Sequence, residues 1–228
     1  ADAVIVPYIG IAVVVLLVAF LFSLTKMPEP PTGARLRFDR SIFRHKHLTR
    51  GVVAQFFYVG AQASIWGLTI DYVIHLLPGV SKEVASGSFL AIGTFLFVAG
   101  RFIGTFLMSY VRENRLLWVF ALCAFLLTIF SIYAGGYLAV YSVLGLNFFM
   151  SIMFPTIFAL GVKDLGEHTK LGSSLIIMAI FGGAALPPLV GAISDSLGIQ
   201  ISFWIPALCF LVVLYYGLSG YKIKEIKA

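Results

Sequence analysis

The chain has 228 residues, of which 60% are hydrophobic and only 11% are charged, and its formal net charge is +6. Soluble domains carry about a quarter charged residues, and no single core of this size could bury so much apolar surface. The composition therefore argues against a soluble globular protein, and we predict an all-α membrane protein whose main solvent is the lipid bilayer.

Seven stretches are apolar and long enough to cross roughly 30 Å of hydrocarbon as helices. The first has no basic leader and is too long for the core of a signal peptide, so we expect a true transmembrane helix. The seven predicted spans are residues 4–24, 49–76, 87–109, 116–134, 138–161, 172–194 and 201–220.

The connection between the first two spans is long, basic and interrupted by Pro28, Pro30 and Pro31. Proline lacks a backbone donor and restricts the residue before it, so this connection cannot be one continuous helix. We predict four parts: a single transmembrane helix over 1–25, a basic cytoplasmic loop over 26–48, a six-helix bundle over 49–221 and a cytoplasmic tail over 222–228.

The basic residues are distributed unevenly between the two sides of the predicted spans. Fifteen of the sixteen Lys and Arg lie on one side, and only Lys82 lies on the other. Under the positive-inside rule the amino terminus is outside and the carboxy terminus is in the cytoplasm. The positive charge is thus explained by topology, and no nucleic-acid partner is needed. Tyr8, Trp118, Tyr215 and Tyr216 lie near span ends and suit the interfacial aromatic belts.

Two predicted spans carry a face that mixes polar and aromatic side chains at helical spacing. Amides and hydroxyls can bond the hydroxyl groups of a sugar, and aromatic rings can pack on its C–H surfaces. The alternative is that these amides form hydrogen bonds between helices. The candidate substrate-binding residues are Gln55, Tyr58, Gln62 and Trp66 on the first face, and Asn147, Ser151, Phe154 and Phe158 on the second.

Other residues suggest structural or gating roles. Gly100 and Gly104 form a G-x-x-x-G pattern that favours close helix packing. The neighbouring Arg101 is expected either to bond helix-end carbonyls or to extend to the headgroups. Pro155 should kink the second polar helix and bring its neighbour Phe154 toward the bundle interior. The pair Pro187 and Pro188 should bend its helix, as a gate or as a fixed kink.

Ionisable residues are missing from the middle of every predicted span. A proton relay needs such a group within the membrane pathway, so a proton-coupling carboxylate would belong to a part of the protein outside this chain. We expect no metal or organic cofactor, and no enzyme, since there is no His-Glu-x-x-His and no nucleophile with a base. A seven-helix receptor, or a channel or packing subunit without transport, remains the alternative of a different class, although no span has the mid-membrane lysine of a retinal protein.

The stretches "AQFFYVGAQ", "GRFIGT", "SIMFPTIFALG", "GEHTKLGSS" and "IPALCF" resemble the carboxy-terminal half of the L-fucose:proton symporter family, within the major facilitator superfamily. The similarity runs from about residue 44 to about residue 212. It implies seven helices that correspond to helices six to twelve of a bacterial inner-membrane transporter. The missing amino-terminal half would hold the coupling carboxylates.

The resemblance also implies a sugar cavity lined by spans 49–76 and 138–161. Gln55, Tyr58 and Gln62 match the fucose-type pattern, whereas Met153 and Phe154 are typical of the related glucose/galactose permeases. We therefore expect a hexose as substrate, with L-fucose first and glucose or galactose as the alternative.

Overall fold

The computed structural model describes residues 2–25 and 40–223, and every regular element in these ranges is a helix. The predicted loop 26–48 is therefore described only from residue 40 onward, and the predicted tail 222–228 only at its first two residues. The chain divides into two compact units, Ala1–Arg37 and Phe38–Ala228. The first contains a single apolar helix, α1 (Asp2–Leu24).

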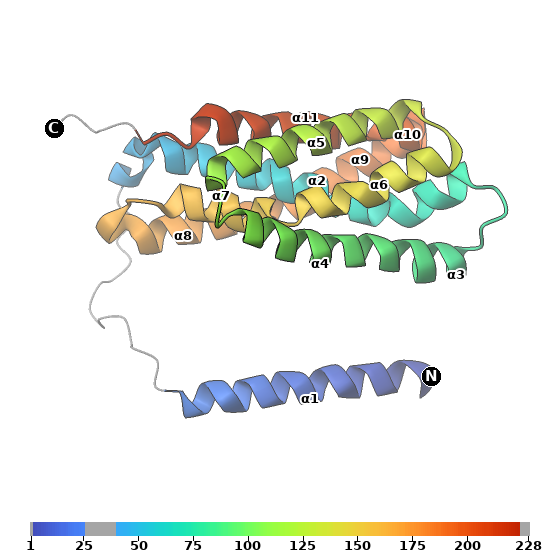
Figure 1. The fold of residues 1–228 in the computed structure, drawn as a ribbon, viewed down its shortest axis with the longest axis horizontal. Helices are drawn as coiled ribbons and strands as arrows, with labels where there is room; N and C mark the ends of the chain where they lie inside the picture. The colour runs from blue at the N-terminus through green and yellow to red at the C-terminus, as the bar shows by residue number, and fades with distance from the viewer. Residues whose placement is uncertain (1, 26–39, 224–228) are drawn as a thin grey trace. The chain divides into compact units, whose positions relative to one another are not determined.

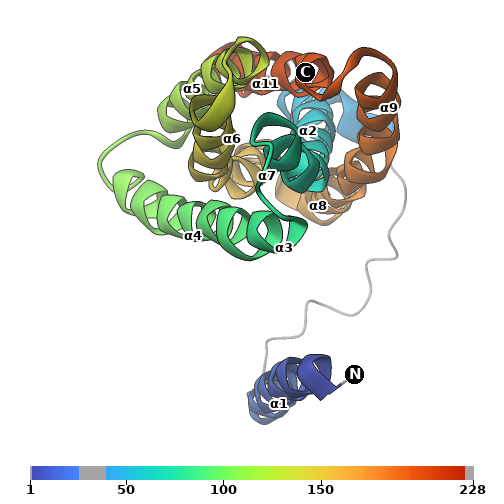
Figure 2. The ribbon, with the colours of Figure 1, turned by 90° about the vertical axis from the view of Figure 1, so that its right-hand side faces the viewer.

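The second unit is a bundle of roughly parallel and antiparallel helices (Figures 1 and 2). It begins with a short 3₁₀ turn, η1 (Arg40–Arg44), and ends with a π-helical turn, η5 (Tyr216–Gly220). The elements between them are α2 (Lys46–Leu76), α3 (Lys82–Val84), η2 (Ala85–Phe89), α4 (Leu90–Leu107), α5 (Glu113–Tyr133), α6 (Gly136–Met150), α7 (Met153–Val162), η3 (Gly166–His168), α8 (Thr169–Met178), η4 (Ala179–Phe181), α9 (Gly182–Leu197), α10 (Ile199–Ser202) and α11 (Trp204–Tyr215).

Five helical runs of the described residues are long and apolar enough to cross a membrane, which makes this a multi-pass membrane protein. They match the last five predicted spans, with ends that differ by a few residues. The other two predicted spans, 4–24 and 49–76, form helices α1 and α2 but are not among the five, so the total of seven stays a prediction. The five runs are Lys82–Leu107, Glu113–Tyr133, Gly136–Val162, Gly166–Leu197 and Ile199–Gly220.

Helix α2 is the centre of the bundle and packs against α6, α7, α9 and α11. It buries one aromatic residue near its middle and another near its far end, Tyr58 and Tyr72, together with small residues that let neighbouring helices approach. At Gly60, an added Cβ would overlap the side chain of Leu186 on α9. At Gly182, a Cβ would overlap the backbone of Phe56 on α2. Glycine at these positions therefore permits α2 and α9 to cross in close contact.

Helix α4 lies at the edge of the bundle and packs mainly against α6 (Figure 2). Its only buried residues are Gly93, Gly100 and Gly104, while large residues such as Phe102 are exposed. A Cβ at Gly100 would overlap the backbone of α6, and one at Gly104 would overlap the side chain of Ile152. The G-x-x-x-G pattern thus provides a close helix contact here, and Gly93 extends it by two turns.

Candidate functional site

The predicted polar face of α2 runs from the interior of the bundle toward its surface. Gln55 and Tyr58 are fully buried, with 0% of their surface exposed. Gln62 is half-buried, and Trp66 is 44% exposed. The face therefore begins inside the bundle and opens outward along the helix.

The second polar face is divided between two helices, because the predicted span 138–161 is interrupted. The helix breaks at a turn formed by Ser151 and Ile152, between α6 and α7. Asn147 and Ser151 are buried, whereas Phe154 and Phe158 are half-buried.

Hydrogen bonds from α2 to α6 bring the two faces together. The Tyr58 hydroxyl donates to the carbonyl oxygen of Met150 at 2.8 Å. The Trp66 indole N–H donates to the side-chain oxygen of Asn147 at 2.7 Å. The rings of Tyr58 and Phe154 also meet edge to face, with centroids 6.5 Å apart. Tyr58 and Trp66 of α2 thus link helices. Among the amides considered for inter-helix bonds, Asn147 takes part in one of these contacts.

Gln55 differs from these residues, because its side chain has no hydrogen bond within the described part of the chain. Neither the amide nitrogen nor the amide oxygen has a partner among the described residues, although both are buried. An unpaired buried polar group costs about 1–3 kcal/mol, and such groups are few in native proteins. The amide can donate two hydrogen bonds and accept two. Gln55 therefore holds unused hydrogen-bonding capacity inside the bundle.

The break between α6 and α7 has a local cause in Pro155. In a continuous helix the N–H of residue 155 would bond the carbonyl of Ser151, but proline has no N–H. The Arg101 side chain of α4 donates to that carbonyl oxygen instead, from Nε at 3.2 Å and from Nη2 at 3.1 Å. Of the two roles considered for Arg101, the structure shows the bond to a carbonyl at a helix end. Its guanidinium carbon also lies 5.1 Å from the centre of the Phe97 ring.

Phe158 lies apart from the other candidate residues. It packs against a small cluster of buried side chains that includes Ile42, Leu48, Leu165 and Ile176. This cluster is separate from the main core, which contains Tyr58.

Pro187 and Pro188 lie within α9, which stays helical through both residues. The departure from α-helical geometry in this run comes earlier, at the 3₁₀ turn η4.

Tyr216 was expected in an interfacial belt, but this expectation is wrong. Its side chain is 1% exposed, and its hydroxyl has no hydrogen-bonding partner among the described residues. A Cβ added at Gly51 would lie 3.0 Å from that hydroxyl, so glycine on α2 leaves room for the ring. The adjacent Tyr215 is 52% exposed, and its place in an interfacial belt stays a prediction. Tyr215 and Tyr216 point to different faces of the same helical run. Their closeness to the end of a predicted span does not show which of the two is buried.

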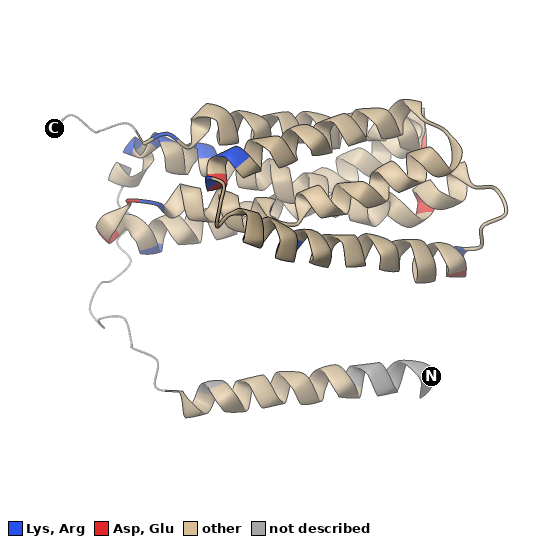
Figure 3. Cartoon of the chain, viewed as in Figure 1, with Lys and Arg blue, Asp and Glu red and all other residues tan. Residues whose placement is uncertain are grey.

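The charged residues of the described bundle are concentrated near its ends (Figure 3). Most of the Lys and Arg that the structure describes lie at the end where α2 begins, whereas Lys82 in α3 lies at the opposite end. The asymmetry read from the sequence is thus present in three dimensions.

No protein-family profile matches the sequence. Individual relatives do match. An L-fucose-proton symporter of Escherichia coli (strain K12) is 39% identical over 220 residues, which are 92% of this chain and 50% of the relative. A glucose/galactose transporter of Brucella abortus is 33% identical over 225 residues, which are 97% of this chain and 55% of the relative. The relatives are transporters and not enzymes.

Solved structures give the same result. The E. coli fucose:proton symporter FucP superposes with a TM-score of 0.84 at 40% identity, covering 92% of this chain and 53% of FucP. A second FucP structure, in the outward conformation, has a TM-score of 0.83 at 38% identity, covering 94% of this chain and 54% of the other. The chain is therefore a homologue of the L-fucose–proton symporters of the major facilitator superfamily and spans about half the length of the relatives it matches.

Proposed function

We propose that the chain forms one half of a secondary active transporter that imports a hexose together with protons by alternating access. L-fucose is the first candidate substrate, and glucose or galactose is the alternative. Similarity to both kinds of sugar transporter, over 92% and 97% of this chain, supports the functional class. In such carriers the substrate site lies near the bilayer midplane between two repeats.

The geometric observation that carries this proposal is the unpaired amide of Gln55. A ligand whose polar groups reach this amide would supply the missing hydrogen bonds. Sugar hydroxyls both donate and accept, which matches the capacity of glutamine. Gln62 and Trp66 continue the same face outward and would contact the sugar as it enters. On this proposal Tyr58, Asn147, Ser151 and Phe154 form the wall behind it, and Phe158 has the weakest support.

The proposal also gives the chain the topology of helices six to twelve in a twelve-helix transporter. Helix α1 would be the last helix of the missing amino-terminal half, followed by the cytoplasmic loop 26–48. The bundle 49–221 would be the carboxy-terminal half. Basic residues at the end where α2 begins support a cytoplasmic location for that end. The amino terminus of this chain would then be outside the bacterial inner membrane, and the carboxy terminus inside.

Proton coupling is assigned to the half that this chain does not contain. The two polar faces of the bundle offer amides, hydroxyls and aromatic rings, which bind sugars but do not carry a proton at neutral pH. A carboxylate across the cavity would have to supply the proton-binding site.

A subunit that packs but does not transport is the second candidate function. The bonds from Tyr58 to Met150 and from Trp66 to Asn147 favour it, because they hold helices together without any ligand.

Uptake assays on the complete transporter distinguish these functions. Proteoliposomes that hold this chain together with the other half should accumulate labelled L-fucose. Unlabelled L-fucose should compete for uptake more strongly than unlabelled glucose or galactose. Proteoliposomes with residues 1–228 alone should not accumulate sugar, and uptake by them would refute the half-transporter proposal.

Three substitutions, at two positions, test the role of the α2 face. Gln62→Leu should abolish uptake while the protein still folds. The cysteines introduced by Gln62→Cys and Gln55→Cys should react with a membrane-impermeant thiol reagent, and sugar should slow the reaction. If Gln62→Leu prevents folding but the surviving protein binds sugar normally, the packing interpretation is correct.

A further inference from the structure

A buried histidine joins the start of α2 to the end of α7. The Nε2–H of His47 donates to the carbonyl oxygen of Lys163 at 3.0 Å, and only 2% of the His47 surface is exposed. Lys163 directly follows the last residue of α7. The helix that carries Gln55 is therefore bonded, at the basic end of the bundle, to the short helix that carries Phe154. We call this bond the His47 contact.

Two more histidines lie beside the His47 contact. The centre of the His45 ring is 5.9 Å from that of His47 and 5.7 Å from that of His168 in η3. The Nε2 atom of His168 lies 3.4 Å from the hydroxyl oxygen of Ser41 in η1. Three imidazole rings thus gather where η1, α2 and the α7–α8 connection meet.

The described charges around the three histidines are mainly positive. Five cations and two anions lie on the elements that meet here, which leaves a charge of +3 before any histidine takes up a proton. A further positive charge is therefore disfavoured while these elements stay together. The cations are Arg44, Lys46, Arg50, Lys163 and Lys170, the anions are Asp164 and Glu167, and the other titratable groups are His45, His168 and Tyr216.

Burial acts in the same direction as these charges. Desolvation lowers the pKa of His47 below its ordinary value of 6.5, and His45 lowers it further, while the Lys163 carbonyl and Asp164 raise it. The net direction is downward, so the charged imidazole is favoured only when the site opens to water.

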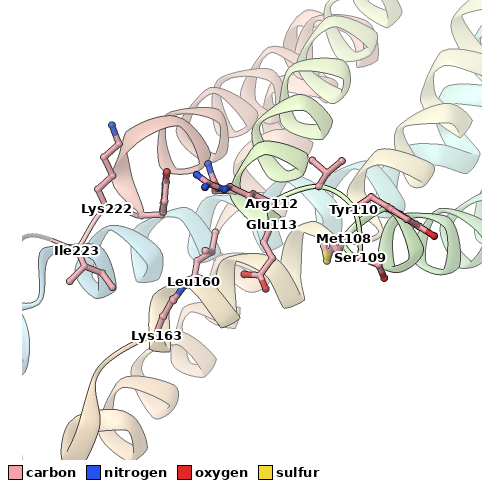
Figure 4. Close-up of a pocket in the computed structure, with 12 residues that line it drawn as sticks. Met108, Ser109, Tyr110, Arg112, Glu113, Leu160, Lys163, Lys222 and Ile223 are labelled. Carbon is pink, nitrogen blue, oxygen red and sulfur yellow. The ribbon is translucent and has the colours of Figure 1, made fainter.

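A cavity beside the His47 contact offers a route for that water. It has a volume of about 820 Å³ and is lined by Lys163 together with residues of the α4–α5 connection such as Arg112 and Glu113 (Figure 4). The residue whose carbonyl accepts the His47 bond therefore also borders a polar cavity at the end of the bundle.

Helix α7 links the His47 contact to the proposed sugar site. It has only ten residues, Met153–Val162, and Phe154 near its first residue belongs to the proposed wall of that site. Phe158 in its middle packs against the small cluster that contains Ile42 of η1. Movement at Lys163 would therefore displace a short helix whose other end faces the sugar.

We propose that His47 is a regulatory proton-binding site on the cytoplasmic side, and that its protonation separates the start of α2 from the end of α7 and slows sugar exchange. The Nε2 atom already carries a hydrogen, so the proton binds at Nδ1. A symporter that imports protons delivers them to this side, and the transported proton would thus limit further transport. The effect on sugar exchange rests on the proposed function, whereas the local opening does not.

Hydrogen–deuterium exchange of the purified 228-residue chain in detergent measures the local opening. Rates at pH 7 and pH 5.5 are corrected for the chemical rate of amide exchange. The peptide over 41–50 should lose protection several-fold and at most about tenfold, since one group that is freed to take up a proton shifts an opening equilibrium by at most about tenfold per pH unit. The peptide over 70–80, at the far end of α2, should keep its protection.

Substitution of single histidines assigns the opening to one group. His47→Gln keeps a donor for the Lys163 carbonyl but cannot titrate, so its 41–50 peptide should stay protected at pH 5.5. His168→Gln removes another ring of the same group, and His75→Gln removes an exposed ring at the other end of α2. Both should open like the unmodified chain.

The effect on transport is measured by sugar counterflow in proteoliposomes that hold the complete transporter, with equal pH on both sides. Counterflow exchanges labelled for unlabelled L-fucose without net proton movement. The unmodified protein and His47→Gln should exchange sugar at the same rate at pH 7. At pH 5.5 we expect His47→Gln to be about threefold faster. Carboxylates of the other half titrate alike in both proteins, so the ratio of the two rates isolates His47.

The possible outcomes separate the proton site from the transport function. Equal loss of protection in His47→Gln and in the unmodified chain would remove His47 as the sensor. Opening without any difference in counterflow would limit His47 to a structural role. Absence of counterflow in both proteins at pH 7 would refute the proposed function and its regulation, while the exchange rates would still decide the proton site. If His47→Gln does not fold, full protection of the unmodified 41–50 peptide at pH 5.5 would refute the opening by itself.

Discussion

Arg101 donates two hydrogen bonds to the carbonyl oxygen of Ser151, at 3.2 and 3.1 Å, and so takes the place of the backbone donor that Pro155 lacks. Helix α4 thus supplies the hydrogen-bond donor that is missing from α7 because residue 155 is proline. Gly100 makes this possible, because a side chain there would overlap the backbone carbonyl of Phe148 and hold α4 away from α6.

This relationship predicts a coupling between Arg101 and Pro155. Arg101→Met should lower the free energy of unfolding by about 2 kcal/mol, since a charged donor to a buried carbonyl is lost. Pro155→Ala restores a backbone N–H that can bond Ser151 directly, so Arg101→Met should cost less in that background. Thermal denaturation of the four proteins in detergent gives the double-mutant cycle. Additive effects, within about 0.5 kcal/mol, would contradict the coupling.

Gln55→Leu should separate stability from transport. Because the Gln55 amide has no partner in residues 2–25 and 40–223, its removal breaks no hydrogen bond there and relieves an unpaired buried group. We expect the melting temperature to stay the same or rise while sugar uptake by the complete transporter is lost. Trp66→Phe is the comparison, because it removes the bond to Asn147 and should lower stability by about 1 kcal/mol. A clear loss of stability in Gln55→Leu would mean that the amide has a structural partner.

Glycine-to-alanine substitutions along one helical run should differ in sign. Gly87→Ala should be neutral or stabilising by up to about 1 kcal/mol, since no atom outside the local helix lies within 4 Å of the new Cβ. Gly100→Ala should destabilise by about 2 kcal/mol, because its Cβ meets rigid backbone. Gly104→Ala should also destabilise, because the obstacle is Cγ2 of Ile152, a buried and β-branched side chain that cannot easily move aside. Equal melting temperatures for the three variants would rule out close packing at α4.

Helical spacing in the sequence was sufficient to predict the polar face of α2 and its meeting with α6, but it did not predict that Phe158 lies apart from the other candidates. The faces on 49–76 and 138–161 meet in the structure through Tyr58 and Trp66, and the last five spans appear as long apolar helices. Both results follow from the period of the α-helix and from the length needed to cross a bilayer.

Spacing along one helix could not show which neighbour each face contacts. Gln55 and Tyr58 lie on the same predicted face of α2. The Tyr58 hydroxyl donates to a carbonyl on α6, whereas the Gln55 side chain has no partner among the described residues. The sequence left two roles open for Arg101. The carbonyl of Ser151 that it bonds lies 50 residues away along the chain, so local pattern could not identify it. Long-range contacts of this kind depend on packing and not on local pattern.

His47 should make the stability of the bundle depend on pH. It lies at the start of α2 with 2% of its surface exposed, and its Nε2–H donates to the carbonyl oxygen of Lys163 at 3.0 Å. Desolvation by burial lowers the pKa of His47 below its ordinary value of 6.5, and the neighbouring His45 lowers it further, against the raising effects of the Lys163 carbonyl and Asp164.

The unfolded chain therefore takes up a proton at this position before the folded chain does, as the pH falls below 6.5. The stabilisation is complete above that pH and is lost as the pH falls through the folded pKa. One such group contributes a slope of at most about 1.4 kcal/mol per pH unit. His47→Gln keeps a donor for the Lys163 carbonyl but cannot titrate, so its melting temperature should fall less between pH 7 and pH 5. The exposed His75, at the other end of α2, supplies the control, and His75→Gln should keep the pH dependence of the unmodified chain. If His47→Gln and the unmodified chain lose stability in parallel over this range, the dependence comes from other groups, and the buried histidine at the start of α2 is not its source.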